Sequence, residues 1–192
     1  SFIIFLLTFF SLSVSHSSEL NIMRDAETEN LFKDISRLLI KDNNLNLGEI
    51  NFFIDNKEYV NAFVIPGQKI FITKGLIIES KELEDIAGVI AHEIGHIVGG
   101  HFSNKMKAME KSAMINVISS ILAAGAIAAG AGQAGTAILL GGQKLGSASF
   151  LSFSRTQESL ADQNAIRLLK KSGFSLQGIL NVFKVLEKNE SL

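Results

Sequence analysis

The 192-residue sequence contains no cysteine. This absence excludes disulfide bonds, thiolate metal sites, a cysteine nucleophile and a lipidated N-terminal cysteine. Any metal ion must therefore be bound by histidine and carboxylate side chains. An excess of one charge is also missing, because 18 basic and 19 acidic residues give a formal net charge of -1 without a long run of either sign. The sequence lacks the run of basic residues that is typical of nucleic-acid binding, so no nucleic-acid partner is expected.

The start of the sequence differs in composition from the rest. Residues 1–12 are apolar and rich in phenylalanine, and residues 11–15 give the small-x-small pattern that a signal peptidase cleaves. We predict a signal peptide over residues 1–15, incomplete at its start because the chain begins without Met or a basic region. An uncleaved anchor is the alternative. With 47% hydrophobic and 19% charged residues, residues 19–192 are predicted to form one domain with a sizeable core.

Three short segments in the first half of the chain are rich in β-branched and aromatic residues. They are separated by Asn56-Lys57 and by Pro66-Gly67, which favour turns. We therefore predict a small antiparallel β-meander formed by residues 51–55, 59–65 and 69–73.

Helices are predicted for most of the remaining chain, because apolar residues recur there with helical spacing. The clearest helix runs from about Lys81 to Val98, with Ser80 placed to cap its start and Gly99-Gly100 to end it. Others are predicted at residues 19–43, 155–171 and 175–188. The expected fold class is α+β and mainly helical, with the meander beside the helix that ends at Val98.

A His-Glu-x-x-His motif begins at His92 within this helix. Residues four apart share a helix face, so His92 and His96 can direct two imidazoles at one metal ion. Glu93 lies beside them, where a carboxylate can act as general base on metal-bound water. The motif predicts hydrolysis with one Zn²⁺ ion per chain. A chance motif on a surface helix is the alternative, and the isoleucines that flank the motif argue against it.

Two residues compete to be the third protein ligand that a catalytic zinc requires. His101 follows the motif much as in the extended metzincin motif, but the position expected for the third histidine is Phe102, one residue later. Glu158 is the other candidate, and it shares a face of a later helix with Asp162. Glu158 would complete a His2Glu site of the gluzincin type. Asp162 could accept a proton from the far nitrogen of a ligand imidazole or serve in proton transfer.

Two further residues are expected beside the metal rather than on it. His101 is placed there because the metzincin spacing is displaced by one residue. Arg155 stands one helical turn before Glu158 and could pair with that carboxylate or with Asp162. A solvated surface arginine is the alternative.

The segment 112–144 has no charged residue before Lys144 and consists largely of Ala, Gly, Ile, Leu and Ser. It is interrupted by Gly125, Gly130, Gly132, Gly135 and Gln133. No uniformly apolar stretch of about 20 residues remains, which disfavours a transmembrane span. We therefore predict flexible or amphipathic helices that contact a membrane surface or form a lid over the active site. A transmembrane hairpin and a plain core segment are the alternatives.

Several motifs follow one another in a family-like order: Asn61-Ala62-Phe63 before Pro66-Gly67, then Thr73-Lys74-Gly75-Leu76, His92 to His96 with His101, and Glu158 with Ala161-Asp162. Over about residues 25–188, this order resembles the gluzincin metallopeptidases that include the CAAX prenyl protease of type one and HtpX. The periplasmic BepA-like proteases are the most similar group, and the chain is expected to represent their peptidase domain alone. The resemblance implies metal ligands at His92, His96 and Glu158, with catalytic roles for Glu93 and Asp162.

The resemblance also implies a substrate site and a cellular setting. An exposed strand can hold an extended polypeptide by backbone pairing, and Asn61, Ala62 and Phe63 are the matching segment. The implied substrates are misfolded or stalled envelope and outer-membrane proteins, and the implied partner is the outer-membrane assembly machinery. The signal-like start and the absent cysteine match periplasmic members, so a periplasmic location is expected, with or without membrane association.

Two other functions remain open at the level of sequence. One is a chaperone or assembly factor with latent hydrolysis, which would hold polypeptides through the strand edge and the apolar segment. The other is a membrane-embedded metalloprotease that uses residues 112–141 as spans. The intact Glu93 favours a working enzyme over a purely binding protein.

Overall fold

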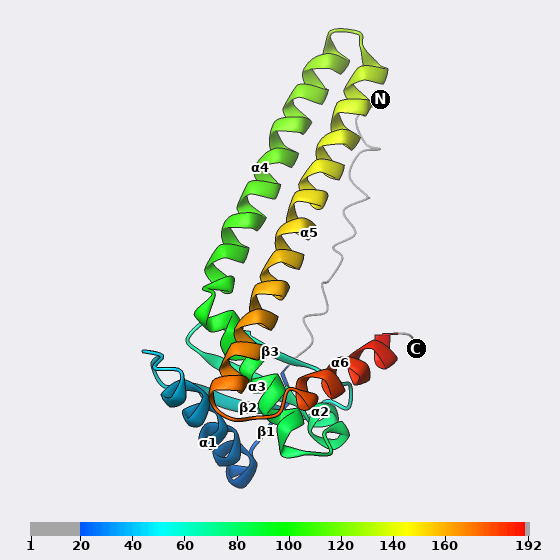
Figure 1. Cartoon of the computed structure of the whole chain (residues 1–192). Coiled ribbons are helices and arrows are strands. Elements are labelled where there is room, and N and C mark those ends of the chain that lie inside the picture. Colours follow the sequence, from blue (N-terminus) through cyan, green and yellow to red (C-terminus); the bar gives the residue numbers. More distant parts are fainter. Residues whose placement is uncertain (1–19, 191–192) are drawn as a thin grey trace.

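Four short strands form a mixed sheet in the computed structural model, which describes residues 20–190 (Figure 1). Across the sheet the order is β1 (Ile22–Met23), β2 (Asn51–Asp55), β4 (Lys69–Thr73) and β3 (Ala62–Ile65). β1 pairs antiparallel with β2 and β3 pairs antiparallel with β4, whereas β2 and β4 run parallel. The predicted signal peptide, residues 1–15, lies outside the described residues.

The α+β, mainly helical class is confirmed, but the sheet is mixed and not the predicted antiparallel meander. Residues 70–73 of β4 are all buried, which is typical of a central strand covered on both faces. β3 is half-buried along its whole length and lies at the edge. β3 therefore folds back on the outer side of β4, so that β4 pairs with β2 in parallel.

The two faces of the sheet carry different side chains because neighbouring residues of a strand point to opposite faces. One face contributes Phe52, Ile54, Ile70 and Ile72 to the hydrophobic core that the sheet shares with the helices. On the other face Phe71 stacks between Phe53 and Phe63, with ring centroids 5.0 and 5.1 Å apart. This second face presents three aligned aromatic rings.

The helices around the sheet are α1 (Ala26–Asp42), α2 (Lys74–Glu79), α3 (Leu83–Val98) and α6 (Gln177–Glu190). α3 lies in the middle, and Ile90, Ala91 and Ile94 on it are completely buried. Its start differs from the expectation, because Glu82 and Asp85 form a capping box there. Ser80 instead ends α2, where its backbone and hydroxyl both donate to the Leu76 carbonyl.

α4 (His101–Ala128) and α5 (Gly132–Lys171) form a long antiparallel hairpin that projects from the rest of the molecule (Figure 1). The helix predicted from residue 155 thus begins much earlier. Gly125 and Gly135 lie inside helices, and the turn between them contains Gly130 at φ +83°. Within residues 20–190, α4 alone is long and apolar enough to cross a membrane by length and composition.

The distal hairpin is residues 112–143, which carry no charged side chain. The base comprises the sheet, helices α1, α2, α3 and α6, and the part of α5 from Glu158 onward.

Candidate metal centre

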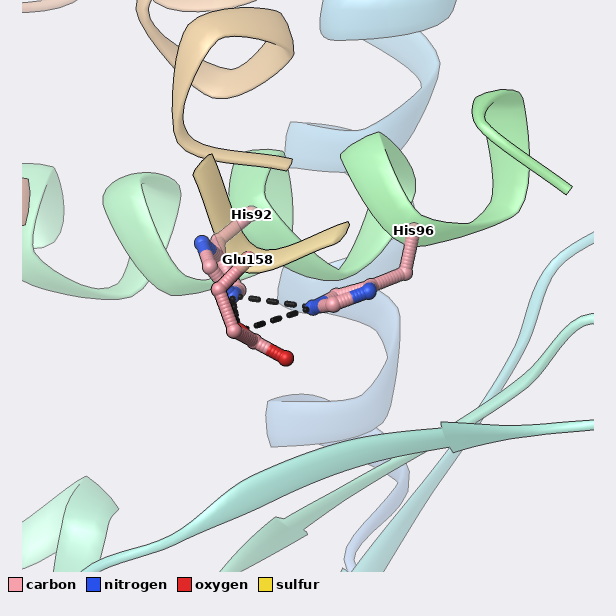
Figure 2. A group of neighbouring side chains, drawn as sticks. All are labelled: His92, His96 and Glu158. Carbon is pink, nitrogen blue, oxygen red and sulfur yellow. Dashed lines mark hydrogen bonds and ion pairs between the residues drawn. The ribbon is translucent and has the colours of Figure 1, made fainter. Parts of the chain in front are cut away.

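α3 holds His92 and His96 on one face, one turn apart, with their Nε2 atoms 3.1 Å from each other (Figure 2). The spacing of four residues produces this geometry because a helix turn contains 3.6 residues. The helix is held rigidly, since Ile90 and Ile94 beside the motif are completely buried. Two imidazole lone pairs can therefore converge on one point.

Glu158 of α5 completes the group. Its Oε2 atom lies 3.5 Å from Nε2 of His92 and 3.5 Å from Nε2 of His96. The three donor atoms lie within 4.8 Å of one another. A tetrahedral zinc with bonds of about 2.1 Å places its ligand atoms about 3.4 Å apart. The distances and the donor types of His92, His96 and Glu158 therefore fit a zinc ion.

A close approach of α5 to α3 delivers Glu158 to the histidines. A Cβ atom at Gly95 would lie 2.6 Å from the Ala161 carbonyl oxygen, so only glycine fits there. Asn164 strengthens the crossing because its side-chain amide donates to the Gly95 carbonyl at 3.4 Å. The glycine of the His-Glu-x-x-His motif thus sets the distance between the helices that carry the candidate ligands.

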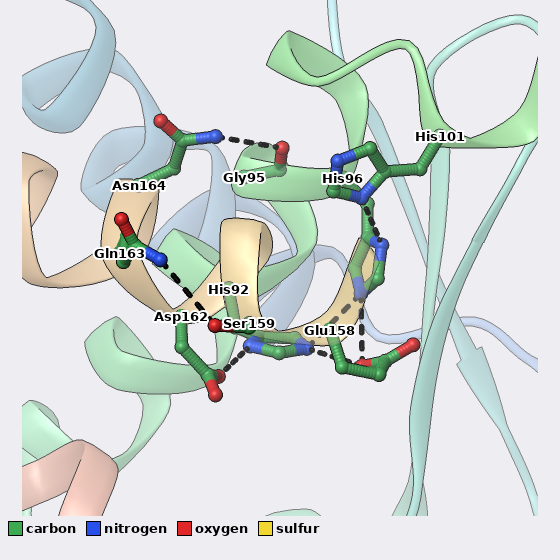
Figure 3. A network of polar contacts seen from close by, with 9 residues as sticks. All are labelled: His92, Gly95, His96, His101, Glu158, Ser159, Asp162, Gln163 and Asn164. Carbon is green, nitrogen blue, oxygen red and sulfur yellow. Dashed lines mark hydrogen bonds and ion pairs between the residues drawn. The ribbon is translucent and has the colours of Figure 1, made fainter. Parts of the chain in front are cut away.

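Each histidine is contacted on its second nitrogen by another side chain (Figure 3). Nδ1 of His92 lies 3.0 Å from Oδ1 of Asp162, and Nδ1 of His96 lies 2.8 Å from Nδ1 of His101. The Asp162 carboxylate favours a proton on Nδ1 of His92, and a proton on Nδ1 of His96 would let that ring donate to His101. With these tautomers, Nε2 of His92 and His96 is free to bind a metal ion.

His101 sits at the start of α4 and is buried, with 5% of its surface exposed. A Cβ atom at Gly99 would lie 2.0 Å from its Nε2, so the imidazole occupies space that glycine leaves open. Burial, followed by the charge of His96, lowers the pKa of His101 and keeps the ring neutral. A neutral ring can accept a hydrogen bond from His96. The structure places His101 on the side of His96 that faces away from Glu158.

Glu158 and His92 influence each other electrostatically. Hydrogen bonds from His92 and His96 hold the pKa of Glu158 far below its usual range, so the carboxylate stays ionised. Burial opposes protonation of His92, but the hydrogen bond to Glu158 and the nearby charges of Glu93 and Asp162 outweigh it and raise the pKa of His92. The group attracts positive charge, as a cation site must.

Glu93 is buried beside the histidines, with 6% of its surface exposed. Burial raises its pKa, while the charges of His92 and His96 and a backbone hydrogen bond from Val64 act in the opposite direction. A carboxylate with a raised pKa is suited to accept a proton near neutral pH. Glu93 is not part of the three-residue group that could hold the metal.

A cleft of about 630 Å³ opens over these residues. Asn61, Ala62 and Phe63 line it, as does Val64, which completes the wall formed by β3. The lining also includes residues that the sequence had not indicated as part of the site: Phe102, Met106, Met109 and Phe183. Apolar residues at 102, 106 and 109 share one helix face, and this spacing was the available signal.

Arg155 lies one turn before Glu158 on α5 and is exposed. It forms no ion pair with either Glu158 or Asp162, although both belong to the described part of the chain. The structure therefore brings together every predicted site residue except Arg155.

Comparison with known proteins identifies the family. Residues 25–190 match the model of Peptidase family M48. The chain is 31% identical over 132 residues to the beta-barrel assembly-enhancing protease of Escherichia coli (strain K12). The aligned residues cover 67% of this chain and 26% of that protein. It is 32% identical over 148 residues to the metalloprotease YcaL of the same strain. This alignment covers 75% of this chain and 54% of that protein.

A mitochondrial relative shows similar identity. The chain is 32% identical over 118 residues to the mitochondrial metalloendopeptidase OMA1 of Schizosaccharomyces pombe (strain 972 / ATCC 24843). The alignment covers 59% of this chain and 31% of that protein. The chain thus spans about a quarter to about a half of the length of these relatives. Because the family match extends over most of the sequence, the chain belongs to peptidase family M48.

Proposed function

We propose that the chain is a zinc-dependent endopeptidase that cleaves unfolded or misassembled polypeptides of the cell envelope. The observation that carries the catalytic part is the convergence of His92, His96 and Glu158 at 3.1 to 3.5 Å, with a buried glutamate beside them. Family membership supports a metallopeptidase. The names of the relatives motivate the envelope substrates and outer-membrane assembly machinery as a partner.

His92, His96 and Glu158 would hold the zinc ion, with Asp162 and His101 orienting the two imidazoles. Bound zinc would polarise the scissile carbonyl and lower the pKa of a water molecule. Glu93 accepts the proton of that water at its buried carboxylate and passes it to the leaving amine. Asp162 contacts His92 directly, so its catalytic contribution is made through that ring.

β3 supplies a backbone edge for the substrate. The Asn61 carbonyl accepts a hydrogen bond from the Thr73 backbone, so Asn61 faces β4. Backbone groups alternate in direction along a strand, and therefore those of Ala62 and Val64 face away from β4. The Val64 N–H donates to Glu93. The backbone groups of Ala62 and the Val64 carbonyl remain at the cleft, where an extended polypeptide can pair with them. Asn61, Ala62 and Phe63 are proposed to position the peptide beside the metal.

Two isosteric substitutions separate water activation from metal binding. Glu93→Gln should reduce cleavage of casein by about 10² to 10⁴-fold while one zinc per chain remains bound, because the general base is lost and the ligands are kept. Glu158→Gln should lose most of the bound zinc, since a ligand charge is removed. Glu79→Gln, an exposed carboxylate on α2, is the control and should change neither quantity. Casein cleavage and zinc content by mass spectrometry are measured together.

Unchanged cleavage in Glu93→Gln would contradict the protease proposal. Unchanged zinc in Glu158→Gln, combined with zinc loss in His101→Ala, would show that His101 is the third ligand. The two results are independent, because hydrolysis and metal content are separate readouts.

The strand edge has its own test. Ala62→Pro removes one backbone N–H at the free edge and leaves the pairing of β3 with β4 intact. The loss of one hydrogen bond should raise KM up to about tenfold with unchanged zinc content. Phe63→Pro is the matched control for damage to the sheet, because Phe63 faces β4 and its substitution should lower overall stability.

A chaperone or assembly factor with latent hydrolysis is the second candidate. The cleft has an open strand edge and an apolar wall that includes Met106 and Met109, which can hold an unfolded chain without cutting it. Full activity of Glu93→Gln in cells that lack the wild-type protein would favour this function. Secretion to the periplasm is part of the leading proposal, and fractionation of cells expressing the chain tests it.

A further inference from the structure

The distal hairpin is built with its large apolar side chains outside. Seven of them are more than half exposed: Met114, Val117, Ile118, Ile121, Leu122, Ile127 and Leu140. In the base, the core isoleucines and leucines are at most 7% exposed. A water-soluble helical pair normally buries such residues between its helices.

Small and polar residues occupy the contact between the two helices instead. Gly135, Gly142 and Gly146 of α5 are buried against α4. A Cβ atom at Gly142 would touch the Ser119 side chain, and one at Gly146 would approach Asn116 and Ser112. Helices associate through small and polar residues in this way when the surroundings are as apolar as their own side chains. The packing is therefore the inverse of that in the base.

The exposed apolar side chains of α4 lie mainly on the side away from α5, since Ser112, Asn116 and Ser119 face α5. At about 100° per residue, Val117, Ile118, Ile121 and Leu122 cover an arc of about 140°, and Leu140 of α5 is exposed as well. A second copy of this chain would need one defined stripe, whereas exposed apolar residues on both helices of the pair suit lipid. The hairpin also projects from the base (Figure 1), and the residues that line the cleft include none from 112–143.

Length and charge agree with a bilayer as the surroundings. At about 1.5 Å per residue, α4 extends about 26 Å beyond Lys111, close to the 30 Å hydrocarbon thickness. The charged residues at the near end of α4 are mainly basic: Lys105, Lys107, Glu110 and Lys111. Lys144 on α5 lies level with the stretch between Asn116 and Ser119, because Gly142 and Gly146 contact those residues. Such lysines can reach anionic headgroups.

We propose that the distal hairpin inserts into a lipid bilayer from the side on which the metal centre lies. The lysines at its near end then contact anionic headgroups, and the turn at Gly130 lies in the hydrocarbon region or beyond it. A position on the membrane surface or over the active site was expected for this segment, with a transmembrane hairpin as the alternative, and the proposal favours insertion. This proposal does not depend on hydrolysis, because no residue of the metal centre is needed for it.

A matched pair of labels tests the insertion in the whole chain. Ile121 on the hairpin and Ile78 on α2 are each 66% exposed, and the sequence has no other cysteine to label. Ile121→Cys and Ile78→Cys are each coupled to the environment-sensitive dye NBD, and vesicles of phosphatidylethanolamine and phosphatidylglycerol are added. We expect the emission to rise several-fold and shift to the blue at position 121 alone. The same result is expected with Glu93→Gln present, which separates it from proteolysis.

Charge substitutions give the second measurement. Ile121→Glu should weaken vesicle binding about tenfold or more, because a carboxylate is expensive in hydrocarbon, whereas Ile78→Glu should not. Circular dichroism checks that both variants fold. An Ile121 label that does not respond to vesicles would overturn the proposal, and concentration-dependent dimers in sedimentation would then identify a second copy as the occupant. Equal responses at both labels, or binding unaffected by Ile121→Glu, would assign attachment to another segment and also overturn it.

Discussion

The base and the distal hairpin place their large apolar side chains on opposite sides. In the base, Ile90 and Ile94 of α3 are completely buried between the sheet and the neighbouring helices. In the hairpin, Ile121 is 66% and Leu140 is 59% exposed, and glycines fill the helix contact. The same types of residue therefore stabilise the base by packing against one another and leave the hairpin to be stabilised by its surroundings.

The cleft lies where these two regions meet. β3 and α3 of the base line the cleft, and Met106 and Met109 from the near end of α4 line it as well. Lys111, less than one turn beyond Met109, precedes the uncharged part of α4. With the hairpin inserted as proposed, the metal centre would open close to the membrane surface. Substitutions that act on one region and spare the other can break or sharpen this comparison.

The largest difference is expected between two isoleucine truncations. Ile94→Ala removes a completely buried side chain from α3 and should lower the free energy of unfolding by about 2 to 5 kcal/mol. Ile121→Ala removes an exposed side chain and should change it by no more than about 0.5 kcal/mol. Urea denaturation followed by circular dichroism, without vesicles, measures both values.

Equal destabilisation by the two changes would break the comparison, because it would mean that Ile121 is packed in the protein. Vesicle binding is the complementary measurement. Ile121→Ala should weaken it, whereas Ile94→Ala should leave it unchanged in the folded fraction.

A glycine at the centre of the base gives the next largest effect. Gly95→Ala places a Cβ atom against the Ala161 carbonyl and forces α5 away from α3. Such overpacking should cost about 1 to 3 kcal/mol of stability. It should also lower zinc affinity, because α5 carries Glu158. Gly125→Ala on α4 is the control, since no atom lies within 4 Å of its added Cβ. Retention of full zinc affinity by Gly95→Ala would show that the crossing does not set the ligand geometry.

The helices and the α+β class were predictable because their signals are local. The apolar spacing between residues 81 and 98 and the glycines after Val98 define α3 to within two residues. The order of strands in the sheet was not predictable in the same way. It depends on β3 lying outside β4, and this arrangement is decided by tertiary packing rather than by the pattern within each strand.

The candidate site could be predicted because each half of it is a pair of residues four apart. His92 with His96, and Glu158 with Asp162, each share a helix face, and the structure brings the two faces together. The role of Gly95 could not be derived, because it depends on how closely α5 approaches. The apolar wall from Phe102 to Met109 was also missed, since a helix face gives no sign of what it lies against.

Zinc affinity should distinguish the two residues that orient the ligand rings. Asp162→Asn removes the carboxylate beside His92, and His101→Leu removes the acceptor beside His96. Each change should weaken zinc binding about 10 to 100-fold, because the ligand imidazole loses its orientation and its preferred tautomer. His101→Gln retains a side-chain acceptor and should recover part of the affinity. Competition with a fluorescent chelator measures the zinc Kd.

A purely structural role for His101 would give a different pattern. Both His101→Leu and His101→Gln would then lower the free energy of unfolding, and zinc affinity would not differ between them. Lys144→Gln, a distant substitution on the hairpin, should leave the zinc Kd unchanged and serves as the control.

The smallest predicted effects come from two adjacent glycines within the hairpin. Gly141 is exposed, and no atom lies within 4 Å of a Cβ atom added there, whereas Gly142 is buried and its added Cβ would touch the Ser119 side chain. Gly141→Ala should stabilise α5 by about 0.5 to 1 kcal/mol, because alanine loses less conformational freedom in a helix than glycine does. Gly142→Ala gains the same helix propensity but must displace Ser119, so it should be neutral or destabilising. Hydrogen exchange of the α5 backbone amides measures the local difference. Stabilisation by both substitutions would mean that the helix contact tolerates larger residues, and the contrast with the tightly packed crossing at Gly95 would then be sharper still.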